Sequence, residues 1–502
     1  MARKLDPKFS RDYSDRNDAY CAKREIERAI NDFTQAIELY ADAFAYYNRG
    51  SAYYEKGILE WVIKDYDKEL APKPNPDMPV CRDEHGTGRH RDDTPDAPVL
   101  RNHDAIHALE VDWKQAIRDY TKAIELDPND AVVYRARANI YRELAIYCHS
   151  RRGDARVNIR REIEQAIKDL TKAIELDPND APAYNSRGII YSEKGELDRA
   201  IKDFTKVIKL DPNDAIGYYN RGLAYTHKVD WEKFDISTKQ LLDRAIRDFT
   251  KAIKLEPNKA DAYYNRAKAY QDKATYESFY DAYPSPIVRA LTKRAFRDLT
   301  KAIKLDPDKV NAYLIRAQAY LEDRQADRAI KDYTKVIKLD PANASIYYLR
   351  GSAYSEDHDS EEAIKDFTKA IELDPNDAGA YIARGDAYRD PCDYFDTNDI
   401  GQAIKDYTKA IELDPTDADA YNIRGDAYKD KGDIESAIAD FNRAIELDPT
   451  NTDAYRHRAR AYAAKKDYPR AIADGEMFLK LGPRYPGEAE EIRQMIEEWR
   501  IS

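Results

Sequence analysis

The chain is poor in cysteine and has no long apolar run. Its 4 cysteines in 502 residues, Cys21, Cys81, Cys148 and Cys392, lie far apart and form no Cys-x-x-Cys pair. This pattern excludes a disulfide scaffold and predicts reduced thiols in a cytoplasmic protein. No stretch approaches the roughly 18 apolar residues of a membrane-spanning helix. The first ten residues, MARKLDPKFS, lack the apolar segment of a secretory signal.

Motifs that carry catalysis are also missing. The sequence contains no Gly-rich phosphate loop, no serine nucleophile elbow and no His-Glu-x-x-His zinc helix. Cys148 and His149 are neighbours in sequence, but neighbouring side chains on a helix point about 100° apart and do not form a nucleophile–base pair. We therefore expect neither an enzyme nor a bound cofactor.

The charge balance argues against nucleic acid as a partner. The chain has 82 basic and 94 acidic residues, a net charge of −12, and an acidic protein binds a polyphosphate poorly unless it has a basic stripe. Hydrophobic residues make up 42% of the chain and include 39 tyrosines. A sequence this rich in apolar and aromatic residues can bury a core, so we expect a folded protein with no nucleic-acid or membrane partner.

An internal repeat runs along most of the sequence. The phrase Leu-Asp-Pro recurs, and an arginine stands three residues after a tyrosine at a base spacing of 34 residues, lengthened in five intervals. Self-similarity of this period indicates a repeat architecture. The arginines are Arg16, Arg49, Arg137, Arg187, Arg221, Arg266, Arg316, Arg350, Arg384, Arg424 and Arg458.

Each unit has the pattern of two helices. In the unit that ends at Pro212, two stripes with i, i+3, i+4, i+7 spacing flank a Lys194-Gly195 turn. A hairpin this short cannot bury its own apolar stripe and must stack on its neighbours, which predicts a solenoid. The two stripes consist of Tyr184, Arg187, Gly188 and Tyr191, followed by Ala200, Asp203, Phe204 and Val207.

The unit resembles the tetratricopeptide repeat (TPR), with its ordered aromatic, small, Tyr, Ala, aromatic, Ala and Pro positions. By this pattern eleven units extend from Tyr13 to Leu481. The resemblance implies an all-α, right-handed solenoid whose first helices line a concave groove. It also implies a non-catalytic adaptor that binds a protein or peptide. We expect one array over residues 1–57 and 112–483, a long insertion at 58–111, and a capping helix at 484–502 with a stripe of Ala489, Ile492, Ile496 and Trp499.

The repeated arginine departs from the family, which usually has an apolar residue at this position. An aspartate occupies the mirrored place on each second helix, from Asp32 in the first unit to Asp474 in the last. Because a guanidinium drawn into a packed seam needs a carboxylate, we predict a structural ladder of bidentate ion pairs. Its members include Arg187–Asp203, Arg221–Asp248 and Arg350–Asp366.

Helical phase places a second set of residues in the groove. The phrase Tyr-Tyr-Asn-Arg occurs three times, and its second tyrosine and asparagine should point inward to contact an extended peptide. Acidic residues at the ends of the first helices favour a basic or neutral partner. The predicted groove residues are Tyr47, Asn48, Tyr219, Asn220, Leu223, Tyr264, Asn265, Lys268 and Gln271. The alternative interpretation is that Tyr-Asn is only a consensus choice of the repeat.

The insertions fall between the two helices of a unit and should form a ridge along one rim. Tyr147, Tyr276, Phe279 and Tyr280 either pack on each other there or dock a partner. We predict a monomer, with a structural protein that self-associates through the rim as the alternative. In the 58–111 insertion, the beginning (58–70) could prolong the first helix, and the middle (71–100) should form a solvated loop. A regulatory zinc site is the alternative for this insertion, with Cys81, His85, His90, His103 and His107 as its candidate ligands.

Overall fold

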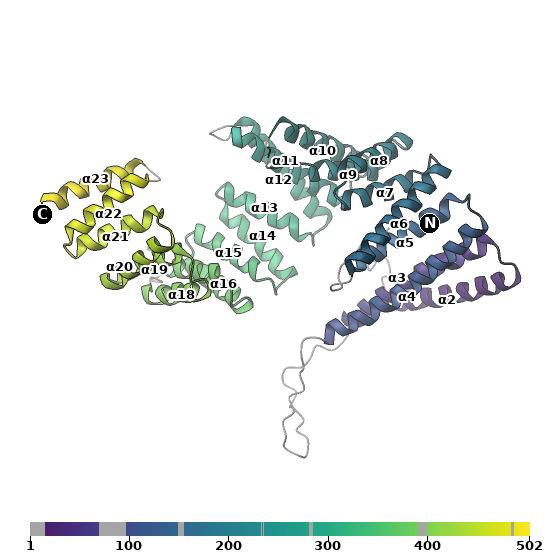
Figure 1. Cartoon of the computed structure of the whole chain (residues 1–502), viewed down its shortest axis with the longest axis horizontal. Coiled ribbons are helices and arrows are strands. Elements are labelled where there is room, and N and C mark those ends of the chain that lie inside the picture. Colours follow the sequence, from purple (N-terminus) through teal and green to yellow (C-terminus); the bar gives the residue numbers. More distant parts are fainter. Residues whose placement is uncertain are drawn as a thin grey trace, which may run out of the picture. The chain divides into compact units, whose positions relative to one another are not determined.

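The computed structural model describes residues 16–69, 97–148, 155–231, 233, 235–280, 285–389, 399–482 and 486–501. Over these residues the chain forms twenty-two helices, α2 to α23, and no strand, which confirms the all-α prediction (Figure 1). Among these helices, none is both long and apolar enough to cross a bilayer. The chain divides into two compact units, Met1–Pro257 and Asn258–Ser502.

Each of these two compact units is a succession of helices; we call Met1–Pro257 unit 1 and Asn258–Ser502 unit 2. Unit 1 contains α2 (Arg16–Leu39), α3 (Ala43–Glu69), α4 (Ala97–Leu126), α5 (Ala131–Cys148), α6 (Ala155–Leu176), α7 (Ala181–Glu193), α8 (Leu197–Leu210), α9 (Ala215–His227) and α10 (Ile236–Leu255). Unit 2 contains α11 (Ala260–Tyr280), α12 (Pro286–Leu305), α13 (Val310–Glu322), α14 (Ala326–Leu339), α15 (Ala344–Glu356), α16 (Ser360–Leu373), α17 (Ala378–Arg389), α18 (Ile400–Leu413), α19 (Ala418–Lys431), α20 (Ile434–Leu447), α21 (Thr452–Ala464), α22 (Tyr468–Leu481) and α23 (Pro486–Ile501).

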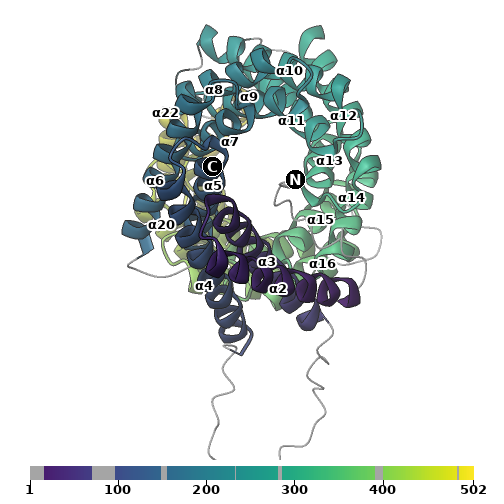
Figure 2. The ribbon, with the colours of Figure 1, turned by 90° about the vertical axis from the view of Figure 1, so that its right-hand side faces the viewer.

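Within each compact unit taken by itself, the helices pack as consecutive pairs, and each pair packs on the next, as the repeat predicts for a solenoid. We call α3, α5, α7 and α9 in unit 1, and the odd-numbered helices α11 to α21 in unit 2, the first helices. The even-numbered helices that follow them, α4 to α10 in unit 1 and α12 to α22 in unit 2, are the second helices. In each unit taken by itself, the first helices line the inner side of the curved stack and the second helices line its outer side (Figure 2).

Small residues let the two helices of a pair approach closely. A Cβ atom added at Gly188 would lie 2.7 Å from the Phe204 ring, and one at Gly385 would lie 2.5 Å from the Tyr407 ring. Both rings are fully buried. Each glycine therefore makes room for an aromatic ring from the facing helix.

The tight turns between paired helices share one backbone feature. The residue eight positions after the repeated arginine has a positive φ angle, 77° at Gly195 and 88° at Gly432. Three non-glycine residues adopt the same left-handed conformation at this position, namely Arg324, His358 and Lys466. The turn is thus a property of the repeat, although only glycine adopts it without a steric cost.

The start of the array corrects one prediction. Arg16 and Asp32 were expected on two different helices, but both belong to the single helix α2. At 1.5 Å per residue they lie about 24 Å apart along the helix axis, too far to form an ion pair. Arg24 occupies the position of the turn glycine here, and the helix continues through it.

The insertions mainly lengthen helices. Helix α3 continues to Glu69 and α4 begins at Ala97, so both ends of the predicted 58–111 insertion are helical. At the other end of the chain, α23 covers the last pair as the predicted capping helix. Its stripe residues Ala489, Ile492, Ile496 and Trp499 are all buried.

Candidate partner-binding surface

The repeated arginine and aspartate face each other in ten helix pairs of the described chain. In each pair the arginine Nε donates to one carboxylate oxygen at 2.6–2.9 Å, and Nη2 donates to the other at 2.7–2.9 Å. The predicted pairs Arg187–Asp203, Arg221–Asp248 and Arg350–Asp366 are among them. These are bidentate, charge-assisted contacts between the two helices of a pair.

The same guanidinium also reaches the preceding pair. Nη1 of Arg350 donates to the Thr334 hydroxyl on α14 at 3.0 Å, and Nη1 of Arg187 donates to Thr171 on α6 at 3.1 Å. One arginine therefore joins three helices: its own, the second helix of its pair, and the second helix before it. The hydrogen bonds to Asp366 raise the pKa of Arg350, so the side chain stays charged.

The predicted groove tyrosines take part in helix packing. The Tyr47 ring lies 5.8 Å from the Tyr120 ring, and the Tyr219 ring lies 5.9 Å from Phe249. Lys309 is placed 5.4 Å from the centre of the Tyr264 ring. All three tyrosines are half-buried. Each can present only part of its ring to a partner, because the rest is used inside the solenoid.

The three predicted asparagines behave differently from one another. Asn48 donates to the Phe44 carbonyl of its own helix at 2.8 Å, and Asn265 donates likewise to Asp261 at 2.9 Å. Asn220 on α9 instead donates to the Oδ1 atom of Asn185 on α7 at 2.8 Å. Asn185, which the sequence analysis did not select, thus forms a pair of amides with Asn220 across two neighbouring first helices.

Helix α11 carries the remaining predicted groove residues of unit 2. Lys268 is exposed and Gln271 is half-buried, and Asp272 follows directly. Burial raises the pKa of Asp272 to about 6, although the positive charge of Lys268 opposes the increase. An additional cation close to this carboxyl group would stabilise its ionised form.

The rim residues are only partly exposed. Phe279 is 68% exposed, but Tyr276 is only 6% exposed, so little of its ring is available to a partner. Tyr147 and Tyr280 lie at the ends of α5 and α11, and their side chains are outside the described set. In unit 1, Ala145, Ile146, Ile159 and Ile163 line a cleft of about 650 Å³ at the rim.

The candidate zinc ligands lie mostly outside the described residues. Cys81, His85 and His90 fall in the range 70–96, which the structure does not describe. His103 and His107 lie on α4, four positions apart as expected, with side chains outside the described set. Among the described residues, no three His, Cys, Asp or Glu side chains come together as metal ligands would.

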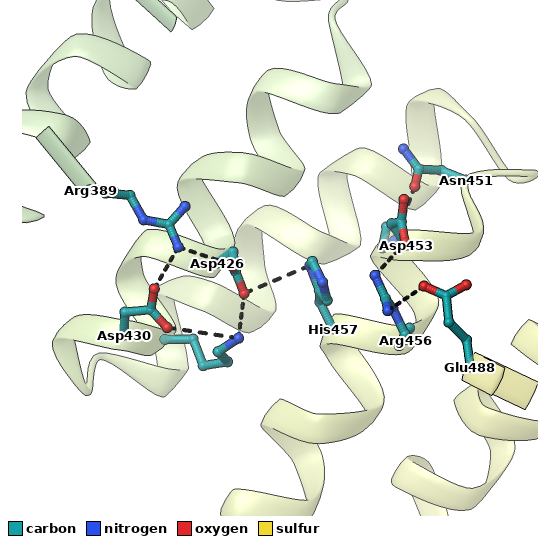
Figure 3. Close-up of polar contacts among 10 residues, drawn as sticks. Arg389, Asp426, Asp430, Asn451, Asp453, Arg456, His457 and Glu488 are labelled. Atoms are coloured by element: carbon teal, nitrogen blue, oxygen red, sulfur yellow. Dashed lines mark hydrogen bonds and ion pairs between the residues drawn. The ribbon is translucent and has the colours of Figure 1, made fainter. Parts of the chain in front are cut away.

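A polar network on α17, α19 and α21 was not predicted from sequence (Figure 3). The Arg389 Nη2 atom donates to Asp426 at 2.9 Å and to Asp430 at 2.5 Å, and Lys429 forms a further ion pair with Asp426. Burial opposes ionisation of Asp426, but the nearby cations outweigh it and lower its pKa to about 2. These contacts join neighbouring first helices on their inner side.

His457 lies at the edge of this network, with its Nδ1 atom 3.8 Å from Asp426 (Figure 3). Burial lowers its pKa to about 4, and the charges of Lys429 and Arg456 act in the same direction against the opposing Asp426 and Asp453. The imidazole is therefore neutral at pH 7. No hydrogen bond to Nδ1 is found among the described residues.

We expect this histidine to make stability depend on pH. In the unfolded chain His457 takes up a proton near pH 6.5, whereas in the folded chain it does so only near pH 4. The free energy of unfolding should therefore fall as the pH drops from 6.5 to 4, by up to roughly 3 kcal/mol. Urea unfolding of the wild type and of His457→Gln at both pH values measures this contribution.

The control for the pH experiment is His227→Gln, which removes an exposed histidine from α9. This variant should keep the pH dependence of the wild type. Equal pH dependence in the wild type and in His457→Gln would show that His457 titrates normally in the folded protein.

Family models match several parts of the chain. A model described as "TPR repeat" matches residues 190–228, 239–273, 325–357, 393–430 and 425–466. Two models described as "Tetratricopeptide repeat" match residues 344–377 and 170–202. No curated protein sequence matches the chain.

Several solved structures are similar to parts of it. A crystal structure of MamA is 28% identical and covers 33% of this chain and 93% of its own, with a TM-score of 0.30. YrrB, described as a TPR protein with an unusual peptide-binding site, is 24% identical over 42% of this chain and 95% of its own, with a TM-score of 0.32. Yeast Tom70 is 18% identical over 81% of this chain and 96% of its own, with a TM-score of 0.33.

The helix pairs of the fold and the repeated family matches lead to the same assignment. Both units consist of paired helices that carry the small-residue and aromatic positions of the repeat, and the family matches fall in both units. Proteins of this family serve generally as scaffolds for protein interactions and are typically not catalysts. The chain is a tetratricopeptide repeat protein.

Proposed function

We propose that the chain is a non-catalytic scaffold that binds an extended segment of a partner protein along the inner side of its first helices. The family to which it belongs supports a protein-binding role in general. The more specific proposal depends on side chains of the first helices that point away from the helix pairs and keep hydrogen-bonding capacity.

The Asn185–Asn220 pair carries this proposal. The bond between the two amides uses one donor and one acceptor. The other half of each amide has no hydrogen bond to a described residue, so one donor and one acceptor remain side by side. An extended peptide presents an N–H and a C=O group at each residue, and a pair of amides is suited to bind both. Leu223, one turn further along α9, is half-buried and offers apolar contact.

The charge of the site in unit 2 favours a neutral or basic partner. On α11, Lys268 and Gln271 provide donors next to Asp272, whose pKa burial raises to about 6. A lysine or arginine of the partner near Asp272 would stabilise the ionised carboxylate, whereas an acidic residue would destabilise it further. We therefore expect a partner segment with few acidic residues.

The rim offers a second, apolar contact in unit 1. The cleft of about 650 Å³ between α5, α6 and α7 is lined by three isoleucines, of which Ile146 is 46% exposed. A cleft of this kind accommodates an apolar side chain of a partner. In unit 2, the 68% exposed Phe279 is the corresponding rim candidate.

The test selects peptides from a random displayed library on the immobilised full chain and measures their affinity by fluorescence anisotropy. Removing both amides in Asn185→Ala/Asn220→Ala deletes about two hydrogen bonds, which should weaken binding by about tenfold or more. The matched control is Asn179→Ala/Asn213→Ala, which removes the same groups from exposed turns.

Equal affinities of the two double variants would place the binding site elsewhere. Self-association through the rim is the alternative function, and light scattering distinguishes it. A mass that stays near 57.9 kDa at all protein concentrations excludes it.

A further inference from the structure

The outer side of unit 2 carries a concentration of positive charge that is unusual for a chain of net charge −12. Helix α12 contains six basic residues, and its one acidic residue is Asp298. Both oxygens of Asp298 are already bound by Arg266 of α11, at 2.7 Å each. The outer face of α12 therefore has no acid of its own to balance its cations.

Three of these cations line one groove. Arg289, Lys293 and Arg297 are spaced four residues apart, which places their side chains on one face of α12 at intervals of about 6 Å. All three are exposed, and none forms an ion pair with a described residue. They line one wall of a groove of about 950 Å³ between α12 and the α13–α14 hairpin.

The groove also has an aromatic floor. The rings of Phe296 and Tyr320 lie 4.9 Å apart, and the Arg328 guanidinium lies 5.7 Å from the centre of the Tyr320 ring. Two acidic residues, Glu322 and Asp323, lie at the hairpin end of the groove, where Asp323 accepts a hydrogen bond from Gln325. The groove thus combines a row of cations, an apolar floor and a short acidic end.

A related groove occurs independently in unit 1. Lys202, Lys206 and Lys209 of α8 line a groove of about 710 Å³, and Lys206 lies 5.7 Å from the centre of the Tyr184 ring. The combination of second-helix cations with an aromatic ring from the first helix is therefore not confined to α12.

The repeat itself shows where this charge arises. In five second helices, a basic residue pairs with a glutamate three positions later, at 2.8–3.5 Å. In α8, α10, α12 and α14 that glutamate is replaced by a lysine, namely Lys209, Lys254, Lys304 and Lys338. The basic residue of these four helices therefore lacks the glutamate that neutralises it within the helix elsewhere in the array, although Lys335 of α14 pairs with Asp308 at 3.9 Å.

We propose that the α12 groove binds an acidic segment of a partner protein that also carries an aromatic or large apolar side chain. The cations would pair with carboxylates of the segment, and the apolar side chain would pack on Phe296 and Tyr320. The acidic end at Glu322 and Asp323 favours a peptide over a nucleic acid, because a polynucleotide would place phosphates against those carboxylates. This surface lies on the outer side of the solenoid and differs in charge preference from the inner site proposed above.

The test measures binding of a fluorescent octapeptide with six acidic residues, one Phe and one Leu. The parent protein for this test is the full chain with Lys202→Gln/Lys206→Gln/Lys209→Gln, so that of the two grooves described only the α12 groove keeps its cations. Adding Arg289→Gln/Lys293→Gln/Arg297→Gln should weaken binding by about tenfold or more, and high NaCl should weaken the parent in the same way.

The matched control adds Lys365→Gln/Lys369→Gln/Lys409→Gln, which removes three exposed positive charges from α16 and α18, and should bind the peptide as the parent does. A peptide with Gln and Asn in place of its acids should not bind. Unchanged affinity after loss of the three α12 cations would overturn the proposal. Tighter binding of an oligouridylate or of phosphatidylserine vesicles through the same three side chains would overturn it as well, and would assign the groove to a nucleic acid or a membrane.

Discussion

Replacement of Arg350 by alanine is expected to lower the free energy of unfolding by about 3–5 kcal/mol. The Asp366 side chain is 7% exposed and accepts both of its hydrogen bonds from Arg350, at 2.6 and 2.7 Å. Without the guanidinium this carboxylate stays buried without a cation, and the link to Thr334 on the preceding pair is also lost. Urea unfolding measures the loss, and hydrogen exchange should place it in α15 and α16, because each pair of a solenoid contacts only its neighbours.

Two further variants separate the ion pair from general effects of charge. Lys365→Ala removes a neighbouring cation whose ion pairs with Glu361 and Glu362 lie on the surface, and it should leave stability unchanged. Arg350→Met/Asp366→Leu removes both buried charges and should be more stable than Arg350→Ala. If Arg350→Ala is as stable as the wild type, the ladder has no structural role at this pair.

The parts of the structure that repeat could be predicted from one sequence. An arginine and an aspartate, such as Arg187 and Asp203, occur in every repeat at the same helical positions. The repeats therefore serve as an internal alignment, in which two residues that always occur together indicate a contact. The capping stripe of Ile492 and Trp499 could be predicted for a different reason. Its apolar residues have helical spacing in a segment that lacks the repeated tyrosine and arginine, and the structure buries all of them.

The first repeat of the array, which contains Arg16 and Asp32, shows where this reasoning fails. Arg16 and Asp32 have the right spacing, but spacing alone does not show whether the chain turns between them. Arg24 replaces glycine at the turn, and the helix continues. Arg324 and Lys466 do turn at the same position in spite of their side chains. The outcome at this position therefore depends on what the two helices can pack against, which local sequence does not specify.

The candidate site was predicted only in part, because its residues vary from unit to unit. Asn220 was selected from a repeated phrase, but its partner Asn185 lies in a unit without that phrase, and asparagine recurs at this position only as Asn422. Arg389, Asp426 and His457 also occupy inner positions where most other units have different residues. A search for non-consensus polar residues at inner positions of successive first helices would have found both groups.

Replacement of Ile492 by alanine in α23 is expected to lower the free energy of unfolding of the C-terminal pair by about 2–5 kcal/mol. Ile492 is fully buried, and it packs with Phe478 of α22 and Tyr455 of α21 in one core cluster. Among the described residues, α23 is the element that packs on α22 and covers this end of the cluster. Loss of the side chain leaves a cavity at the one interface that shields these rings from water.

The effect should be local, and that property distinguishes a cap from a general packing residue. Hydrogen exchange should become faster in α21, α22 and α23 of Ile492→Ala, while α11 to α15 keep the rates of the wild type, because stability passes only between neighbouring pairs. Gln494→Ala changes an exposed residue of the same helix and is the matched control. Faster exchange along the whole of unit 2 would contradict a nearest-neighbour array and show that the unit unfolds as one cooperative body. Unchanged exchange in α21 and α22 would show instead that the last pair is stable without its cap.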